Sequence, residues 1–182
     1  MKKKAWVSLV AVVLVLCCAV GGTLAWLTDK TGPVKNTFTV GDINIDLTET
    51  TKDYKMVPGN TITKDPKVTV KANSEACWLF VKVEESANFG DFMTYEMANG
   101  WTQGDGTKIP ANVFYREVAA TTAAIDFSVL QGDSVSVKDT VTKADLNALT
   151  QNTFPTLTFT AYAVQKDNIA DAKTAWAEAS KL

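Results

Sequence analysis

Residues 77–85 read CWLFVKVEE, and this stretch decides the fold. A strand with one face in water places a polar side chain at every second position, but near its start this stretch is apolar at both sets of positions. It therefore predicts a central strand that is covered on two sides. We expect Cys77, Leu79, Val81 and Val83 to form its inward face, with Cys77 as a small buried residue rather than a nucleophile.

Shorter stretches with a period of two residues surround this strand. They lie at residues 38–47, 68–71, 113–118, 125–130, 134–138 and 157–165. Turn signals separate them at residues 58–60, 65–66, 104–106 and 131–133. Strands and helices do not alternate regularly, so the pattern predicts a mainly β fold, an antiparallel jelly-roll-like β-sandwich, rather than a parallel sheet.

Two helices are expected within this β fold. The stretch Thr142-Lys143-Ala144-Asp145 has the form of a capping box and predicts a short connector helix between two strands. A C-terminal helix is predicted because Ala172, Ala175, Trp176 and Ala179 share one helical face, with Asn168 as its expected N-cap. We expect that face to pack on the sandwich through Trp176.

Residues 1–25 have the pattern of a secretory signal peptide. Three lysines precede an uncharged run, and small residues at positions 23 and 25 predict cleavage between Ala25 and Trp26. An uncleaved membrane anchor is the alternative, because residues 5–25 are long enough to span a bilayer. A lipoprotein signal at Cys17 or Cys18 is disfavoured, because Leu16 is bulky where such signals have a small residue.

Three segments follow from this interpretation: a signal peptide at 1–25, an N-terminal segment at 26–36 and a β-sandwich domain at 37–182. The protein is expected to be secreted, to the extracellular matrix or the cell surface, and to touch the membrane only through the uncleaved signal. Removing residues 1–25 leaves 15 basic and 20 acidic side chains, a net charge of −5. This acidic balance, without a basic cluster, argues against nucleic acid as a partner.

The chain contains no histidine. Histidine is the usual acid or base near neutral pH and the commonest metal ligand, so its absence removes Ser-His-Asp systems, Cys-His systems and His-ligated metal sites. A hydrolase would have to use carboxylates such as Glu84 and Glu85 or Asp126 and Asp133. We expect no cofactor, no metal and no enzymatic activity.

Four stretches resemble one family of proteins. Residues 21–29 (GGTLAWLTD) and 36–45 (NTFTVGDINI), and less specifically residues 56–64 and 160–165, are similar to the TasA/camelysin (CalY) family of SipW-dependent biofilm-matrix proteins. The resemblance implies a jelly-roll-like sandwich that is exported and cleaved by a signal peptidase of the SipW type. Some relatives are labelled metallopeptidases, but without histidine that activity is not carried over.

The resemblance also implies how such a protein works. Each subunit of an extracellular fibre would place its N-terminal segment as a missing strand in the next subunit, with Trp26, Leu27, Thr28 and Asp29 in the donor strand. The partners would be other copies of this chain and related matrix subunits. Two alternatives stay open: a monomeric surface binding or adhesion module whose segment folds back on its own sheet, and a carboxylate-dependent hydrolase.

Overall fold

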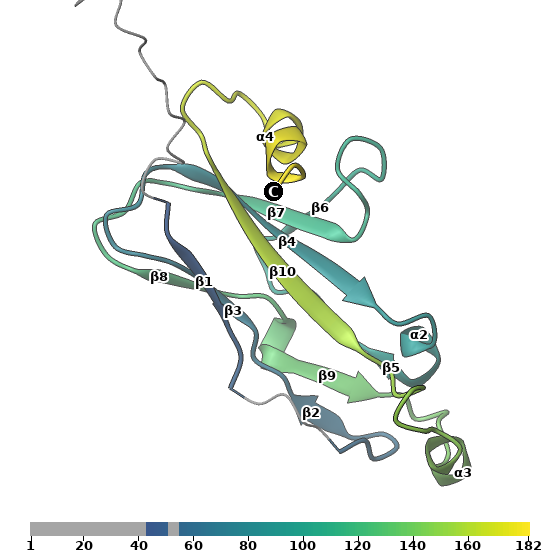
Figure 1. Ribbon diagram of the computed structural model, residues 1–182. Helices are drawn as coiled ribbons and strands as arrows, with labels where there is room; N and C mark the ends of the chain where they lie inside the picture. Colours follow the sequence, from purple (N-terminus) through teal and green to yellow (C-terminus); the bar gives the residue numbers. More distant parts are fainter. Residues whose placement is uncertain (1–42, 51–54) are drawn as a thin grey trace, which may run out of the picture. The chain divides into compact units, whose positions relative to one another are not determined.

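A computed structural model describes residues 43–50 and 55–182 of the chain (Figure 1). The predicted signal peptide, the cleavage site at Ala25 and Trp26, and the candidate donor strand lie outside the described residues. Within them the chain forms ten strands: β1 (Ile45–Thr48), β2 (Thr61–Thr63), β3 (Lys67–Val70), β4 (Cys77–Glu85), β5 (Met93–Thr94), β6 (Thr102–Gln103), β7 (Val113–Val118), β8 (Ile125–Ser128), β9 (Ser134–Val137) and β10 (Leu157–Gln165). The helices are α2 (Phe89–Phe92), α3 (Lys143–Asn147) and α4 (Ala172–Ala179), with a 3₁₀ turn at Gln131–Asp133.

The strands pair antiparallel in three sheets. The larger sheet has the order β10-β4-β7-β6, and the two smaller sheets have the orders β1-β3-β8 and β2-β9-β5. Because β2 leads into β3 and β8 leads into β9 through short linkers, the two smaller sheets follow one another along one layer (Figure 1). The prediction of a mainly β, antiparallel fold is confirmed, and the jelly-roll connectivity stays a prediction.

The strand β4 lies at the centre of the core. Its inward side chains Cys77, Leu79, Val81 and Val83 are at most 2% exposed and pack against the β1-β3-β8 sheet through Val68 and Val70 of β3. Phe80 on the opposite face is fully buried as well. The predicted two-sided burial of this strand is therefore confirmed.

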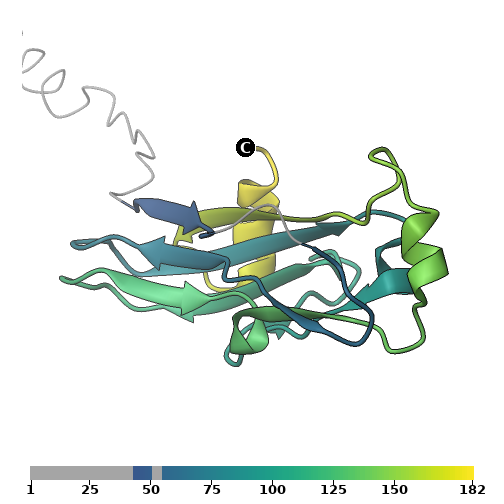
Figure 2. The same ribbon diagram turned by 90° about the horizontal axis from the view of Figure 1, so that it is seen from below.

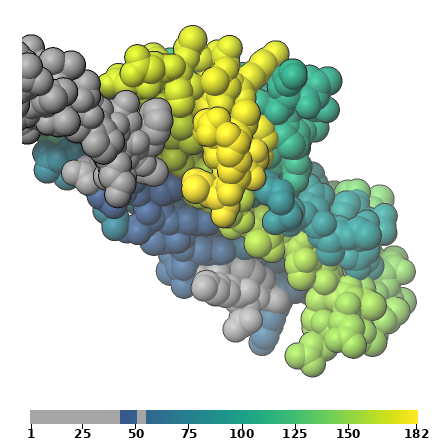
Figure 3. Space-filling model, turned by 45° about the horizontal axis from the view of Figure 1, so that its top comes forward, coloured from purple at the N-terminus to yellow at the C-terminus, as the bar shows by residue number. Residues whose placement is uncertain are grey.

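The helix α4 covers the outer face of the larger sheet. Its four predicted inward residues are all buried, and the Trp176 ring lies 5.3 Å from the Phe80 ring and 5.5 Å from the Tyr162 ring, centroid to centroid. Figure 3 shows α4 in yellow lying over the yellow-green chain of β10. Apolar burial of this kind stabilises a helix as short as eight residues, which would not persist alone in water.

The helix starts were predicted correctly in one case and wrongly in the other. At α3, Thr142 and Asp145 form the expected capping box. At α4, the N-cap is Asp171, whose side chain accepts from the Thr174 amide at 2.8 Å, and not Asn168. Asn168 has a φ of +64°, a conformation that asparagine tolerates well, so it belongs to the turn that precedes the helix.

The strand directions give the domain two ends. At the upper end of Figure 1, β1 begins and β10 finishes: Ile45 pairs with Val70, and Gln165 pairs with Cys77. At the lower end β10 begins, beside α3, and Figure 2 shows α3 at the opposite end of the domain from the start of β1. In the part of the chain described here, no helix is both long and apolar enough to cross a membrane.

Candidate functional site

A sandwich of two open sheets has two sides along which the edge strands of the two sheets lie opposite each other, and we call each side a seam. The chain itself covers one of the two seams. Residues 95–103 cross this seam from β5 to β6. The Ala98 amide donates to the Val129 carbonyl at 2.9 Å, and the Trp101 indole Nε1 donates to the Ser128 carbonyl at 2.9 Å. Backbone polar groups and apolar side chains of this seam are therefore covered by the protein's own residues.

The other seam runs between β1 and β2 on one layer and β10 on the other. Each of these strands stands at the edge of its sheet, and among the described residues no strand pairs with the outer edge of any of them. Edge strands present rows of backbone N–H and C=O groups that accept a further strand. The unpaired edges of β1, β2 and β10 therefore lie along one seam, in which β1 and β10 approach one another closely.

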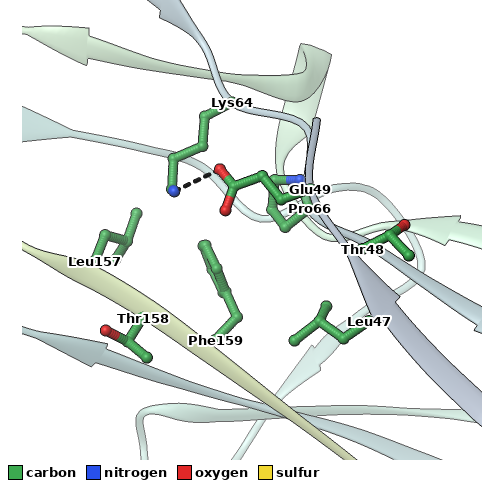
Figure 4. Close-up of a pocket in the computed structure, with 8 residues that line it drawn as sticks. All are labelled: Leu47, Thr48, Glu49, Lys64, Pro66, Leu157, Thr158 and Phe159. Carbon is green, nitrogen blue, oxygen red and sulfur yellow. Dashed lines mark hydrogen bonds and ion pairs between the residues drawn. The ribbon is translucent and has the colours of Figure 1, made fainter. Parts of the chain in front are cut away.

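A cavity of about 540 Å³ lies in this seam, and we name it the seam groove (Figure 4). It is lined by Leu47, Thr48, Glu49, Lys64, Pro66, Leu157, Thr158 and Phe159. Strand alternation places Leu157 and Phe159 on the inward face of β10, where both pack against the core. Leu47 meets them from β1 and is 37% exposed. The groove thus has apolar walls that remain accessible to solvent.

Two polar contacts hold the end of β1 on its own layer. Lys64 Nζ lies 2.6 Å from Glu49 Oε1, with the two side chains only 10% and 17% exposed, and 5.5 Å from the centre of the Phe159 ring. Next to this pair, the Thr50 amide and hydroxyl both donate to the Asp65 carboxylate, and these bonds hold the pKa of Asp65 below its usual value. Both contacts join residues 49–50 to residues 64–65, and Lys64 also reaches across the groove to Phe159 of β10.

A second cavity, of about 910 Å³, continues the seam groove at the lower end of the domain. We name it the lower cleft. Lys64 and Leu157 line both cavities, so the two are neighbours. The cleft is walled mainly by apolar side chains of residues 56–62 and of the region around α3, and Val57 and Phe154 are 48% and 49% exposed.

Three of the four carboxylates considered as hydrolytic pairs contact other side chains. Glu84 forms an ion pair with Lys82, Glu85 accepts from the Tyr95 hydroxyl at 2.8 Å, and Asp126 accepts from the Thr69 hydroxyl at 2.7 Å. These are contacts to neighbours on the sheet rather than a shared site.

The thiol of Cys77 fits the structural role predicted for it. It is fully buried, and desolvation raises its pKa to about 11. A thiol with such a pKa is protonated at neutral pH and is a poor nucleophile.

Comparison with known families supports the resemblance seen in the sequence. Residues 1–86 match the family described as camelysin metallo-endopeptidase. The resemblance to the camelysin family is confirmed. Searches of curated proteins and of solved structures found no match. The camelysin match includes β1 to β4, and so contains the half of the seam groove that β1 and the β2–β3 linker provide.

The camelysin description implies a metal, and the residues present do not fit one. The chain has no histidine, and residues 43–50 and 55–182 bring together no group of three or more Cys, Asp or Glu side chains that could hold an ion. No catalytic step is therefore derived through a metal.

The sequence did not reveal the residues of the seam groove. Glu49 and Lys64 look like solvated charges in a polar stretch, and they become neighbours only because β1 returns to the layer that contains β2 and β3. The exposed edge of β10 was also hidden, since its sequence alternates like that of any strand. The site residues that the sequence predicts, Ala25 and Trp26 at the cleavage site and Trp26 to Asp29 in the donor strand, lie outside the described residues.

Proposed function

We propose that this protein is a secreted structural subunit of extracellular fibres, and that its seam groove receives residues 26–36 of a neighbouring copy as an added strand. The observation that carries the proposal is the contrast between the two seams, because one is covered by the protein's own chain and the other presents unpaired edges around an apolar groove. Strand addition satisfies such edges with main-chain hydrogen bonds, while side-chain pockets provide specificity.

The length and composition of the N-terminal segment support this assignment. Eleven residues, 26–36, would extend about 36 Å as a strand, and the nine residues of β10 extend about 30 Å. The segment begins with Trp26 and Leu27, which a secreted protein would otherwise expose to water. Burying large apolar side chains stabilises association by about 25 cal/mol per Å² of area removed from water.

Export of the protein is part of the proposal. Cleavage after Ala25 would make Trp26 the first residue of the secreted form, and the similarity to camelysins over residues 1–86 includes this region. The protein has no enzymatic role in this proposal, and its partners are other copies of itself and related matrix subunits.

Deleting the segment tests the proposal directly. The secreted protein, whose first residue should prove to be Trp26 on N-terminal sequencing, is compared with a version that starts at Thr37 by electron microscopy at rising concentration and by thermal unfolding. We expect filaments from the first and none from the second. The second should keep its melting temperature, because in this proposal the segment packs in a neighbouring copy rather than in its own domain.

Point variants sharpen the comparison. Replacing Trp26→Ser and Leu27→Ser together should abolish filaments, whereas Lys30→Ser in the same segment should leave them intact. Filaments that persist without residues 26–36 would refute the mechanism. A large loss of thermal stability on deletion would favour the alternative, a monomeric binding module whose segment folds back on its own sheet.

A further inference from the structure

We infer that Asn99 and Gly100 form a self-modifying site, at which the Asn99 side chain turns into a carboxylate that pairs with Arg116. The two residues lie in the segment 95–103, which covers one seam of the sandwich, and not in the seam groove. The inference combines three observations: a free backbone nitrogen, a free side-chain amide and a guanidinium group without an acid partner.

The chemistry needs water and no other reactant. In an Asn-Gly pair the glycine nitrogen attacks Cγ of the asparagine, a new C–N bond closes a cyclic imide, and the side-chain nitrogen leaves as ammonia with the proton that the glycine nitrogen loses. Water then adds to either imide carbonyl and breaks its bond to the glycine nitrogen. The products are aspartate, or isoaspartate with the main chain running through Cγ, and the acid proton passes to the ammonia. Glycine permits the attack because it has no side chain to hinder it.

The two reacting groups are accessible in the folded protein. Asn99-Gly100 is the only Asn-Gly pair in the sequence, and both residues are exposed in a turn. Gly100 has a φ of +89°, a conformation that favours glycine. Within the part of the chain that the structure describes, the Gly100 amide donates no hydrogen bond and the Asn99 side chain makes none. No local contact therefore holds the amide away from the nitrogen that attacks it.

A second pair of residues shows how the fold can protect such a site. Asp105-Gly106 could form the same imide, and Gly106 has a φ of +74°. Its amide, however, donates to the Ile109 carbonyl at 2.9 Å. The Asp105 carboxylate accepts from three backbone amides and pairs with Lys173. These contacts occupy the nitrogen and keep the carboxyl group charged, a form that nucleophiles attack poorly. We therefore expect the folded protein to react at one pair and not at the other.

The Arg116 guanidinium stands directly beside the Asn99-Gly100 turn. A Cβ atom at Gly100 would lie 2.9 Å from Arg116 Nη2. The centre of the guanidinium lies 4.1 Å from the Phe127 ring and 5.4 Å from the Trp101 ring, centroid to Cζ, so cation–π contacts hold it in place. Its Nε atom is buried and has no hydrogen-bond partner. The aromatic rings thus position this group but supply no opposite charge.

The acids on the surrounding elements do not supply that charge either. Glu117, next to Arg116 on β7, pairs with Lys166. Asp126 of β8 accepts from a hydroxyl of β3, and Glu96 of the covering segment forms no ion pair within the described residues. Desolvation lowers the pKa of the guanidinium. Neighbouring Cα atoms are about 3.8 Å apart, so a carboxylate at position 99 lies within a side chain's reach of the group that Gly100 contacts. The new ion pair would tie the covering segment to β7.

Ageing the secreted protein in mildly alkaline buffer at physiological temperature tests the modification. We expect a single acidic species on isoelectric focusing, with the change mapped to Asn99 by peptide mass spectrometry. Asn99→Gln keeps the amide but closes the ring far more slowly, so it should give no such species. In urea both pairs should react, and isoaspartate should then also appear at Asp105. A folded protein whose Asn99 stays intact while the unfolded chain reacts would overturn the inference.

The variant Asn99→Asp tests the pairing with Arg116. At pH 7 it should melt about 1–3 °C above the parent protein, the shift that a partly exposed ion pair gives in a domain of this size. The pairing lowers the pKa of the carboxyl in the folded state, so the gain is present above about pH 4 and lost as the pH falls towards 2.

Two comparisons assign this gain to Arg116. It should disappear when Asn99→Asp is combined with Arg116→Gln and compared with Arg116→Gln alone. High salt should also reduce it, and that measurement does not require the Arg116 variant to fold. A melting temperature equal to that of the parent, or a gain that persists in the Arg116→Gln background, would refute the pairing. Neither result depends on whether the protein forms filaments.

Discussion

Introducing a carboxyl group at Val81 tests the central position of β4. The side chain of Val81 is fully buried and stands in register between Ala161 of β10 and Phe114 of β7. Val81→Asp removes an apolar side chain whose burial is worth about 1.5–3 kcal/mol. It also places an unpaired acid in the core, and uncompensated buried charges cost about 3–5 kcal/mol. A domain with a total stability of about 5–15 kcal/mol would lose much of it.

The loss of stability in Val81→Asp should depend on pH. Burial disfavours the charged form, so the pKa of the introduced carboxyl would be higher in the folded state than in the unfolded chain. The folded state then binds the proton more tightly, and the destabilisation is largest above that raised pKa and shrinks as the pH falls. Urea unfolding, monitored by tryptophan fluorescence at pH 7 and near pH 4, measures the free energy of unfolding at the two pH values.

Two control variants isolate the cause of this effect. Val81→Asn has a similar shape but no charge to lose, so its deficit should be nearly independent of pH. Asn44→Asp is exposed and should change stability by less than about 0.5 kcal/mol. A folded Val81→Asp variant with unchanged stability at pH 7 would show that the reasoning about this core position is wrong.

Two further predictions concern α4 and the loop that contacts it. Trp176→Ala should cost about 3–5 kcal/mol in urea unfolding, because it removes a buried indole that packs 5.3 Å from the Phe80 ring, and an unchanged midpoint would contradict the docking of α4. The Asp105 carboxylate accepts backbone bonds, first from Thr107, and pairs with Lys173 of α4, which holds its pKa far below the usual value. Its stabilisation is therefore present above about pH 4 and lost as the pH falls below it, so Asp105→Asn should melt lower than the parent protein at pH 7 and approach it near pH 2.

The long strands could be predicted because their signals are local. The bounds predicted for residues 77–85, 113–118 and 157–165 are the bounds of β4, β7 and β10. The strands β5 and β6 have two residues each, too few to establish a period, and they exist because residues 95–103 need to cross between layers. The N-cap of α4 was wrongly placed at Asn168 for a similar reason. Asn and Asp are both common N-cap residues, and only the preceding turn decides which of the two caps the helix.

The seam groove could not be predicted because it is made of segments far apart in the chain. Leu47, Lys64 and Phe159 come together only when β1, the β2–β3 linker and β10 are placed on facing layers. Their local patterns say nothing about which strand stands at an edge. The N-terminal segment is different, since apolar residues that follow a predicted cleavage site are visible in the sequence alone.

The position of β10 in the larger sheet has a consequence for the timing of assembly. β10 is the last strand of the chain, and it pairs over its whole length with β4, eighty residues earlier at its centre, where Ala161 meets Val81. Contacts so distant in sequence form slowly and only after most of the chain is available. A chain threading through a membrane from its N-terminus would complete one wall of the groove last. Under the proposed function, copies could then accept a strand only after translocation is finished, which would confine polymerisation to the outside of the cell.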